Sequence, residues 1–193
     1  PHRNPDKGML PPKLARMIIN FLSSELVQKT DKKLLDPFCG TGTLLIEGLE
    51  LGWQVFGSDL SREAITQSGE NLRWFTQKFS LPETYALACL DAVHIDTKST
   101  GGKVTAIVTE PFLGKQQPKP DQLAGMFKGL EKQYLGILKK WTTVLENGGE
   151  VVLVTPLVEV GKRQYDLSKI IDKSREFGYS TVSYTHLTLP TKR

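Results

Sequence analysis

The sequence contains few of the residues that hold metals or cross-link small proteins. Its 193 residues include two cysteines, Cys39 and Cys89, and three histidines, His2, His94 and His186. Their spacings match no zinc motif, and two isolated cysteines do not make a disulfide framework. We therefore expect no bound metal and no structural disulfide, and we expect the reducing environment of the cytoplasm.

Long apolar runs are also absent. No stretch reaches the roughly 18 consecutive apolar residues that a membrane-spanning helix needs, so we expect no membrane association. The chain begins Pro1-His2-Arg3-Asn4, without an initiator Met or the apolar segment of a signal peptide, and we expect a missing upstream domain. The net charge of +4 is compatible with a polyanionic partner but does not identify one.

Apolar runs of strand length alternate with amphipathic segments of helical period along the chain. Strands are expected at residues 34–38, 54–59, 85–89, 104–109 and 150–155, with a further one from Gly178. Helices are expected at residues 11–22, 43–51, 61–79, 121–145 and 167–177, and Asn147-Gly148-Gly149 is expected to form a turn. This alternation predicts an α/β fold with a doubly wound, mostly parallel, Rossmann-like sheet.

The first predicted strand enters a glycine-rich turn, Asp36-Pro37-Phe38-Cys39-Gly40-Thr41-Gly42-Thr43. In doubly wound sheets, ligands bind at the carboxyl ends of the strands, and glycines let the backbone approach a ligand closely. The start of the following helix offers free amides to a carboxylate or a phosphate. This turn is therefore the first candidate binding site.

Three ligands compete for this turn. A dinucleotide-binding turn would have a third glycine where Leu45 stands, and the Walker pattern of nucleotide-binding loops is absent. S-adenosylmethionine fits better, because Asp36 stands where a carboxylate can meet the methionine ammonium and would repel a pyrophosphate. A purely structural turn, with Asp36 as a turn-former, is the alternative.

Two further acids follow predicted strands. Asp59 ends the second strand at the place where nucleoside-binding sheets put an acid that accepts the ribose hydroxyls. Asp91 follows the third strand, where a carboxylate can accept a hydrogen bond from the adenine amine. The alternatives are a helix cap at Asp59 and an ordinary loop at Asp91. The predicted cofactor-binding residues are Asp36, Phe38, Gly40, Thr41, Gly42, Thr43, Asp59, Leu60, Asp91 and Ala92.

The fourth predicted strand ends in Glu110-Pro111-Phe112-Leu113. Methylation of an exocyclic amine needs an acceptor that orients the amine and a flat group that holds the base outside its stack. Glu110 supplies the acceptor, Pro111 a rigid turn and Phe112 a stacking surface. The alternative is a solvated Glu110 and a Phe112 that fills the core. Direct transfer needs no covalent intermediate, so no nucleophile is assigned.

Three segments resemble one known family: Met9-Leu10-Pro11-Pro12-Lys13-Leu14-Ala15-Arg16, the turn at residues 36–43, and Asp59. They resemble the catalytic domain of the RNA methylase family joined to THUMP domains, which makes N2-methylguanosine in tRNA. The resemblance implies a class I methyltransferase fold, S-adenosylmethionine as donor, and a flipped guanine as acceptor. It also implies tRNA or another RNA as partner, docked through the upstream domain.

The fourth strand departs from the pattern of such families, Asp-Pro-Pro-Tyr or Asn-Pro-Pro-Tyr. Here Glu110 stands at the acid, Phe112 at the second proline and Leu113 at the aromatic position. A displacement of about 1 Å at a reacting centre can cost about a hundredfold in rate. A catalytically weakened, cofactor-binding RNA-interaction module is therefore kept as an alternative. A DNA amino-methyltransferase is a second alternative, because the same fold and turn serve both kinds of enzyme.

Substrate contacts are expected from four basic residues near the predicted site. Lys115 and Lys119 lie in the loop after the fourth strand, and Lys13 and Arg16 lie on the first helix, which covers the cofactor pocket in the family. The lysines of the 121–145 helix are expected to be an ordinary solvated face: Lys128, Lys132, Lys139 and Lys140.

The chain is expected to divide into three segments. Residues 1–28 form a helical segment that covers the cofactor site, and residues 29–181 form the methyltransferase domain. Residues 182–193 resemble translated sequencing-adapter read-through, so we expect a non-native tail that replaces the last strands of the fold.

Overall fold

The computed structural model describes residues 10–115 and 117–181. His2, His186, the predicted tail at 182–193 and the first nine residues of the predicted N-terminal segment lie outside the described residues. By its internal contacts the chain forms two units. The first, termed the sheet unit, comprises Pro1–Phe112 and Lys140–Val154, and the second, termed the α5 unit, comprises Leu113–Lys139 and Thr155–Arg193.

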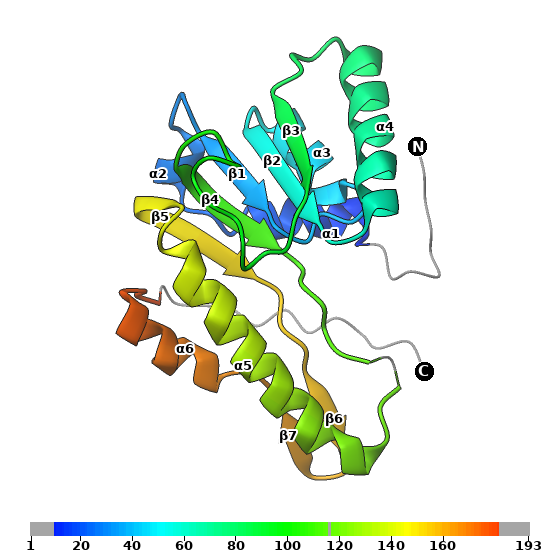
Figure 1. The fold of residues 1–193 in the computed structure, drawn as a ribbon, viewed down its shortest axis with the longest axis vertical. Coiled ribbons are helices and arrows are strands. Elements are labelled where there is room, and N and C mark those ends of the chain that lie inside the picture. The colour runs from blue at the N-terminus through cyan, green and yellow to red at the C-terminus, as the bar shows by residue number, and fades with distance from the viewer. Residues whose placement is uncertain (1–9, 116, 182–193) are drawn as a thin grey trace. The chain divides into compact units, whose positions relative to one another are not determined.

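The sheet unit is built on five parallel strands (Figure 1). They are β1 (Lys33–Asp36), β2 (Gln54–Asp59), β3 (Tyr85–Cys89), β4 (Val104–Thr109) and β5 (Leu145–Leu153). Their order in the sheet is β3-β2-β1-β4-β5, so the direction of winding reverses between β1 and β4. The predicted doubly wound parallel sheet is confirmed, and its switch point is where such folds bind ligands.

Four helices belong to this unit: α1 (Pro12–Ile19), α2 (Ser24–Val27), α3 (Thr43–Glu50) and α4 (Arg62–Phe79). α3 packs against β1 and β2, α4 packs against β2 and β3, and α1 packs against α3. Ser61 caps α4 as predicted, since its hydroxyl accepts a hydrogen bond from the Ala64 amide at 3.2 Å.

Burial explains why the strands of this sheet have almost continuous apolar sequences. Every residue of β4 is buried, as are Leu34 and Leu35 of β1, which is typical of a strand with both faces covered. A Cβ atom at Gly57 of β2 would lie 2.4 Å from Cδ1 of Leu45 on α3. The close approach of α3 to β2 therefore requires glycine at this position.

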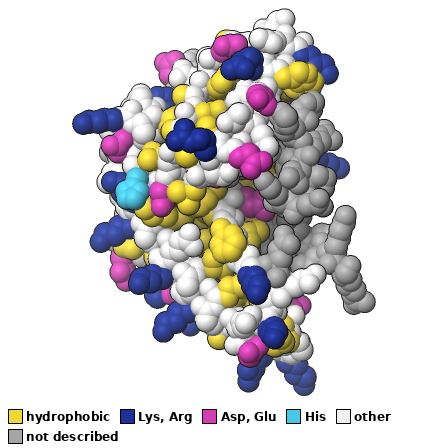
Figure 2. Space-filling model, turned by 45° about the vertical axis from the view of Figure 1, so that its right-hand side comes forward, with side chains coloured by type: hydrophobic (Ala, Val, Ile, Leu, Met, Phe, Trp, Pro, Cys, Tyr) yellow, Lys and Arg dark blue, Asp and Glu magenta, His cyan; other side chains and the backbone are white. Residues whose placement is uncertain are grey.

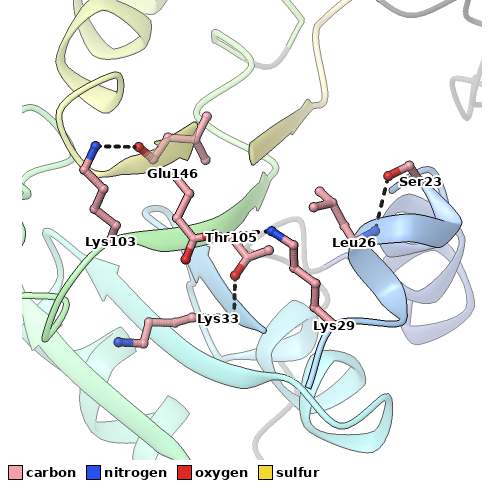
Figure 3. Close-up of polar contacts among 8 residues, drawn as sticks. Ser23, Leu26, Lys29, Lys33, Lys103, Thr105 and Glu146 are labelled. Carbon is pink, nitrogen blue, oxygen red and sulfur yellow. Dashed lines mark hydrogen bonds and ion pairs between the residues drawn. The ribbon is translucent and has the colours of Figure 1, made fainter. Parts of the chain in front are cut away.

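Lysines hold the amino-terminal edge of the sheet together (Figure 3). The Lys33 amide donates to the Thr105 hydroxyl at 3.1 Å, which links β1 to β4. The Lys103 ammonium donates to the Leu145 carbonyl at 3.3 Å, which links β4 to β5. Asp36, Asp59 and Glu110 stand at the opposite, carboxyl-terminal edge of the sheet.

The α5 unit contains α5 (Leu123–Trp141) after a short 3-10 turn at Pro120–Gln122, a hairpin of β6 (Val158–Val160) and β7 (Arg163–Tyr165), and α6 (Lys169–Ser174). The last two residues of α5 count with the sheet unit. Within the unit, Lys173 pairs with Glu131 at 2.5 Å, and the Tyr179 hydroxyl donates to the Leu138 carbonyl at 2.9 Å.

Several predicted boundaries were wrong. The 121–145 helix ends at Trp141, and Asn147-Gly148-Gly149 lies inside β5, because Leu145 already pairs with Val104. The pairing shifts register between Val104 and Ala106, and this irregularity accommodates the two glycines. The 167–177 helix is shorter and ends in a 3-10 turn. Among the described residues, no strand starts at Gly178, which instead caps that turn at φ +91°.

Candidate functional site

The carboxyl-terminal ends of β1, β2 and β4 bring three predicted site segments to one edge of the sheet. Asp36 of β1 pairs in register with Gly57 of β2, two residues before Asp59. On its other side, Leu35 pairs with Ile107 of β4, so that strand ends beside Asp36 as well. Residues distant in sequence thus surround the switch point.

Asp36 is a buried carboxylate held by two donors. It is 1% exposed, and its Oδ1 accepts hydrogen bonds from the Thr109 hydroxyl at 2.7 Å and from the Phe38 amide at 3.1 Å. Burial raises the pKa of Asp36 to about 7; the two hydrogen bonds oppose this rise, whereas Asp59 and Glu110 add to it by repulsion. Among the described residues no lysine or arginine pairs with Asp36, so an ammonium group would stabilise its charge.

The loop after β1 is tied to its neighbours through its own backbone. The Gly40 amide donates to Oδ2 of Asp59 at 3.0 Å, and the Thr41 carbonyl accepts from the side-chain amide of Asn71 at 3.0 Å. The Gly42 amide donates back to the Cys39 carbonyl at 2.8 Å. β2 and α4 therefore fix the loop from outside.

The two glycines of the loop are needed for different reasons. Gly40 has φ +51° with open space where a side chain would be, which lets a ligand approach the backbone. Gly42 has φ +87°, and a Cβ there would lie 2.5 Å from the hydroxyl oxygen of buried Ser68. Gly42 is the N-cap of α3 and provides no side-chain cap, so the first amides of α3, from Thr43 onward, are available to a carboxylate.

Asp59 serves the loop and still has capacity for a ligand. Its two carboxylate oxygens accept from the Gly40 amide and, at 2.8 Å, from the Ser61 amide. Each oxygen keeps a second lone pair that can accept from a ribose hydroxyl. Leu60, the next residue, is 69% exposed. The ribose role of Asp59 stays a prediction.

The two predicted adenine contacts, Asp91 and Ala92, already have hydrogen-bond partners within the chain. The carboxylate of Asp91 accepts from the Val93 amide at 3.0 Å, which forms a local turn. Ala92 is buried, and its carbonyl accepts from the Trp141 indole at 3.3 Å. The backbone at this position is thus anchored, and the adenine role of the pair stays a prediction.

The segment after β4 is open. Glu110 is half-buried, and burial raises the pKa of its carboxyl. Pro111 is buried, whereas Phe112 is 59% exposed. Phe112 therefore does not fill the core, which contradicts the structural alternative for this residue. An exposed aromatic beside a half-buried carboxylate can stack against a base whose amine the carboxylate accepts from.

The four predicted substrate contacts lie in different settings. Arg16 joins α1 to α3: its Nε is 2.6 Å from the Glu47 carboxylate, and it also pairs with Glu50. The hydrogen bond with Glu47 is the main reason that the pKa of Arg16 is raised. Lys13 is exposed on α1, and Lys115 and Lys119 are exposed in the α5 unit. Their contacts with substrate stay predictions, and Arg16 has a structural task besides.

Two residues of the site were not predicted from the sequence. Thr109 is the last residue of an apolar strand and holds Asp36, and Asn71 is a polar residue on the buried face of α4 and holds the loop. In both cases the signal was a polar residue at a position where the pattern calls for an apolar one.

Two features are absent from the described residues. They contain no cluster of three or more His, Cys, Asp or Glu side chains suited to a metal ion. They also contain no helix with the length and apolar character to span a bilayer.

Relatives of known activity match the sequence over most of its length. The chain is 29% identical over 177 residues to a tRNA (guanine(10)-N2)-dimethyltransferase of Methanothermobacter thermautotrophicus, a match that covers 90% of this chain and 45% of the relative. The chain therefore spans less than half the length of that relative.

Solved structures share the fold. TrmN from Thermus thermophilus superposes with a TM-score of 0.56 at 24% identity, over 76% of this chain and 38% of that one. A SAM-dependent methyltransferase from Agrobacterium tumefaciens gives a TM-score of 0.59 at 18% identity, over 88% of this chain and 51% of that one. At these identities the likeness shows the fold, that of class I methyltransferases.

The match to a protein family extends over nearly the whole chain. Residues 2–181 fit the family described as "RMKL-like, methyltransferase domain". This range includes the loop after β1, the acid that ends β2 and the segment after β4. The chain belongs to the family of RMKL-like methyltransferase domains.

Proposed function

We propose that this domain binds S-adenosylmethionine at the loop after β1 and methylates an exocyclic nitrogen of an RNA base, with guanine N2 in tRNA as the target. The observation that carries the proposal is the 2.7 Å hydrogen bond between Thr109 and Asp36. It joins the acid suited to the ammonium of the donor to the strand that continues into Glu110-Pro111-Phe112. Donor and acceptor sites are thereby adjacent.

The residues at the carboxyl-terminal edge fit the parts of the donor. The Asp36 carboxylate accepts hydrogen bonds from the ammonium, and the first amides of α3 donate to the carboxylate of the same amino-acid end. Asp59 accepts from the ribose hydroxyls, with Asp91 and Ala92 at the adenine. When bound, S-adenosylmethionine supplies a methyl group made electrophilic by its positive sulfur.

Glu110 and Phe112 act on the acceptor base. Phe112 stacks on the base and keeps its amine in line with the methyl group. Glu110 accepts a hydrogen bond from the amine and so directs the nitrogen lone pair to the methyl carbon. As the nitrogen–carbon bond forms and the carbon–sulfur bond breaks, the amine loses a proton, which Glu110 takes. The raised pKa of Glu110 makes it a stronger base.

Guanine N2 in tRNA is the proposed target because the relative from Methanothermobacter thermautotrophicus is a tRNA (guanine(10)-N2)-dimethyltransferase. That relative is more than twice as long as the matched part, so the proposal includes an upstream RNA-binding domain that docks the tRNA. Lys13, Lys115 and Lys119 would add phosphate contacts. Such a reaction takes place in the cytoplasm, where tRNA is found.

The test is single-turnover transfer of a labelled methyl group from S-adenosylmethionine to unmodified tRNA. We expect label on guanine N2, found by nucleoside analysis, and none on a DNA duplex of equal concentration. The Glu110→Gln variant serves as the matched control, because it should bind the donor but transfer slowly. Label on a DNA adenine or cytosine amine would instead favour a DNA amino-methyltransferase. Donor binding without transfer to either nucleic acid would favour the weakened RNA-interaction module.

A further inference from the structure

The two units carry opposite net charges. The described residues of the sheet unit include 11 Lys and Arg against 14 Asp and Glu, a net charge of −3. Those of the α5 unit include 10 Lys and Arg against 6 Asp and Glu, a net charge of +4. Figure 2 shows Lys and Arg side chains exposed on one face of the molecule. The positive charge of the chain is thus concentrated in the unit that lacks the cofactor loop.

Helix α5 has one face made entirely of glycine and lysine. Its buried residues, such as Leu123, Phe127, Leu130 and Tyr134, follow a helical period. The opposite positions, spaced three, four or seven residues apart, are all exposed, and we term them the glycine–lysine face: Gly125, Lys128, Gly129, Lys132, Gly136 and Lys139.

The glycines of this face are not explained by packing against other described residues. A Cβ atom at Gly125, Gly129 or Gly136 would meet no other atom within 4 Å. Glycine inside a helix is unfavourable relative to alanine, so three in one helix need another reason. Without side chains at these positions, the helix backbone between the lysines is open to close approach by a partner.

Two lysines of this face have no acidic partner within the described part of the chain. Lys128 and Lys132 form no ion pair with any described residue. The one acid of α5, Glu131, pairs with Lys173 at 2.5 Å. Lys128 and Lys132 are one helical turn apart, about 6 Å along the axis, so the face presents a row of point charges.

We propose that the glycine–lysine face of α5 binds the phosphate backbone of the substrate RNA, an inference that rests on the proposed function. A protein partner would need apolar or aromatic anchors at the centre of its interface, and this face offers none. A row of lysines on an uncovered helix suits a polyanion that is read by charge alone. The exposure of Lys128, Lys132 and Lys139 agrees with the expected solvated face, to which the proposal adds a ligand.

The test compares the tRNA affinity of Lys128→Ala/Lys132→Ala with that of the parent chain, by fluorescence anisotropy over a range of salt concentrations. We expect affinity to fall about tenfold at moderate salt, and the slope of log affinity against log salt to decrease by about 2, one unit per lost phosphate contact. Lys78→Ala/Lys98→Ala, with the same charge change on exposed lysines of the sheet unit, should change neither quantity by as much.

A second variant tests the open backbone separately from the charge. Gly129→Leu keeps every lysine and has room for the new side chain, so the fold should persist. If RNA approaches the helix closely, this variant should bind tRNA severalfold more weakly, with an unchanged salt slope. Thermal unfolding verifies that each variant is folded.

The possible results separate the proposals. If Lys128→Ala/Lys132→Ala keeps the tRNA affinity and the salt slope of the parent chain, this face does not bind RNA and the proposal is overturned. Substitutions that weaken binding of polyglutamate but not of tRNA also overturn it, and assign the face to an acidic protein. Donor binding by calorimetry and methyl transfer are measured independently. A chain that binds tRNA through α5 and transfers no methyl group would overturn the proposed function alone.

Discussion

The loop after β1 and the segment after β4 lie at the same edge of the sheet but are held in different ways. Gly40, Thr41 and Gly42 of the β1 loop are each fixed by a hydrogen bond from a neighbouring element or the loop itself. After β4, Glu110 is half-buried and Phe112 is 59% exposed. The loop after β1 is thus held by contacts within the chain, as suits the proposed donor side, whereas the segment after β4 is open, as suits the proposed acceptor side.

The largest effect is expected from a substitution on the proposed acceptor side that leaves donor binding intact. Glu110→Gln removes the proton acceptor and the charge that orients the amine, so single-turnover methyl transfer to tRNA should fall by about a thousandfold. Donor affinity, measured by calorimetry, should stay within about twofold, because the donor is held by the other segment. Equal losses in transfer and donor affinity would show that the two sides are not separable.

Asp36→Asn breaks the donor side. The loss of the charge that meets the ammonium should weaken S-adenosylmethionine binding by about a hundredfold, since a hydrogen bond to a charged group contributes about 2–3 kcal/mol. Thermal stability at neutral pH should not fall, because burial disfavours the charged form that the substitution removes. Unchanged donor affinity would rule out the assigned role of Asp36.

The pH dependence of donor binding sharpens the same comparison. Burial raises the pKa of Asp36 from 3.8 to about 7, so between these values the native chain keeps a proton that the unfolded chain has lost. The contribution of Asp36 to the free energy of unfolding therefore falls as pH rises from 3.8 to about 7. Over the same range donor affinity should rise by up to about tenfold per pH unit, because the ammonium binds the charged carboxylate, and it should level off above about pH 7.

Titration calorimetry across this window measures the dependence. Asp36→Asn should abolish it, whereas Glu110→Gln should retain it, since Glu110 affects Asp36 only by repulsion. An unaltered pH profile in Asp36→Asn would assign the titration to another group.

The smallest expected effect concerns the contact between the two sides. Thr109→Val removes a donor to a buried carboxylate, so donor affinity at neutral pH should fall about tenfold. In the parent chain this hydrogen bond lowers the pKa of Asp36, so its removal raises that pKa. Donor affinity of the variant should therefore recover at higher pH, where Asp36 is again charged. Thr109→Ser should retain parent affinity. A loss that is the same at every pH would indicate a packing defect in place of a hydrogen bond.

The fold could be predicted because periodicity and burial agree in the sheet. The bounds of β2, β3 and β4 match the expected ranges, since each apolar run ends at an acid or within two residues of one: Asp59, Asp91 and Glu110. The prediction for residues 141–150 was wrong because a turn sequence, Asn147-Gly148-Gly149, lies inside β5, where the pairing with β4 shifts register. These residues belong to a strand only because they pair with β4, and such long-range pairing cannot be read from the local sequence.

The candidate site could be predicted where a residue follows a strand, and not where it acts through another residue. Asp36, Asp59 and Glu110 were found because a charge after an apolar strand is conspicuous. Thr109 and Asn71 were missed because a lone hydroxyl or amide in a buried pattern has many ordinary explanations. The α5 lysines were set aside for the same reason, and the open space at Gly125, Gly129 and Gly136 became visible only in three dimensions.

The contact of Arg16 with Glu47 has a mechanical consequence. Arg16 is on α1 and Glu47 is in the middle of α3, whose first turn carries the amides after Gly42. Displacing α1 would pull on the helix that begins at the glycine loop. A force applied at the amino-terminal end of the described chain would thus be transmitted through this ion pair to the loop after β1, the proposed donor site.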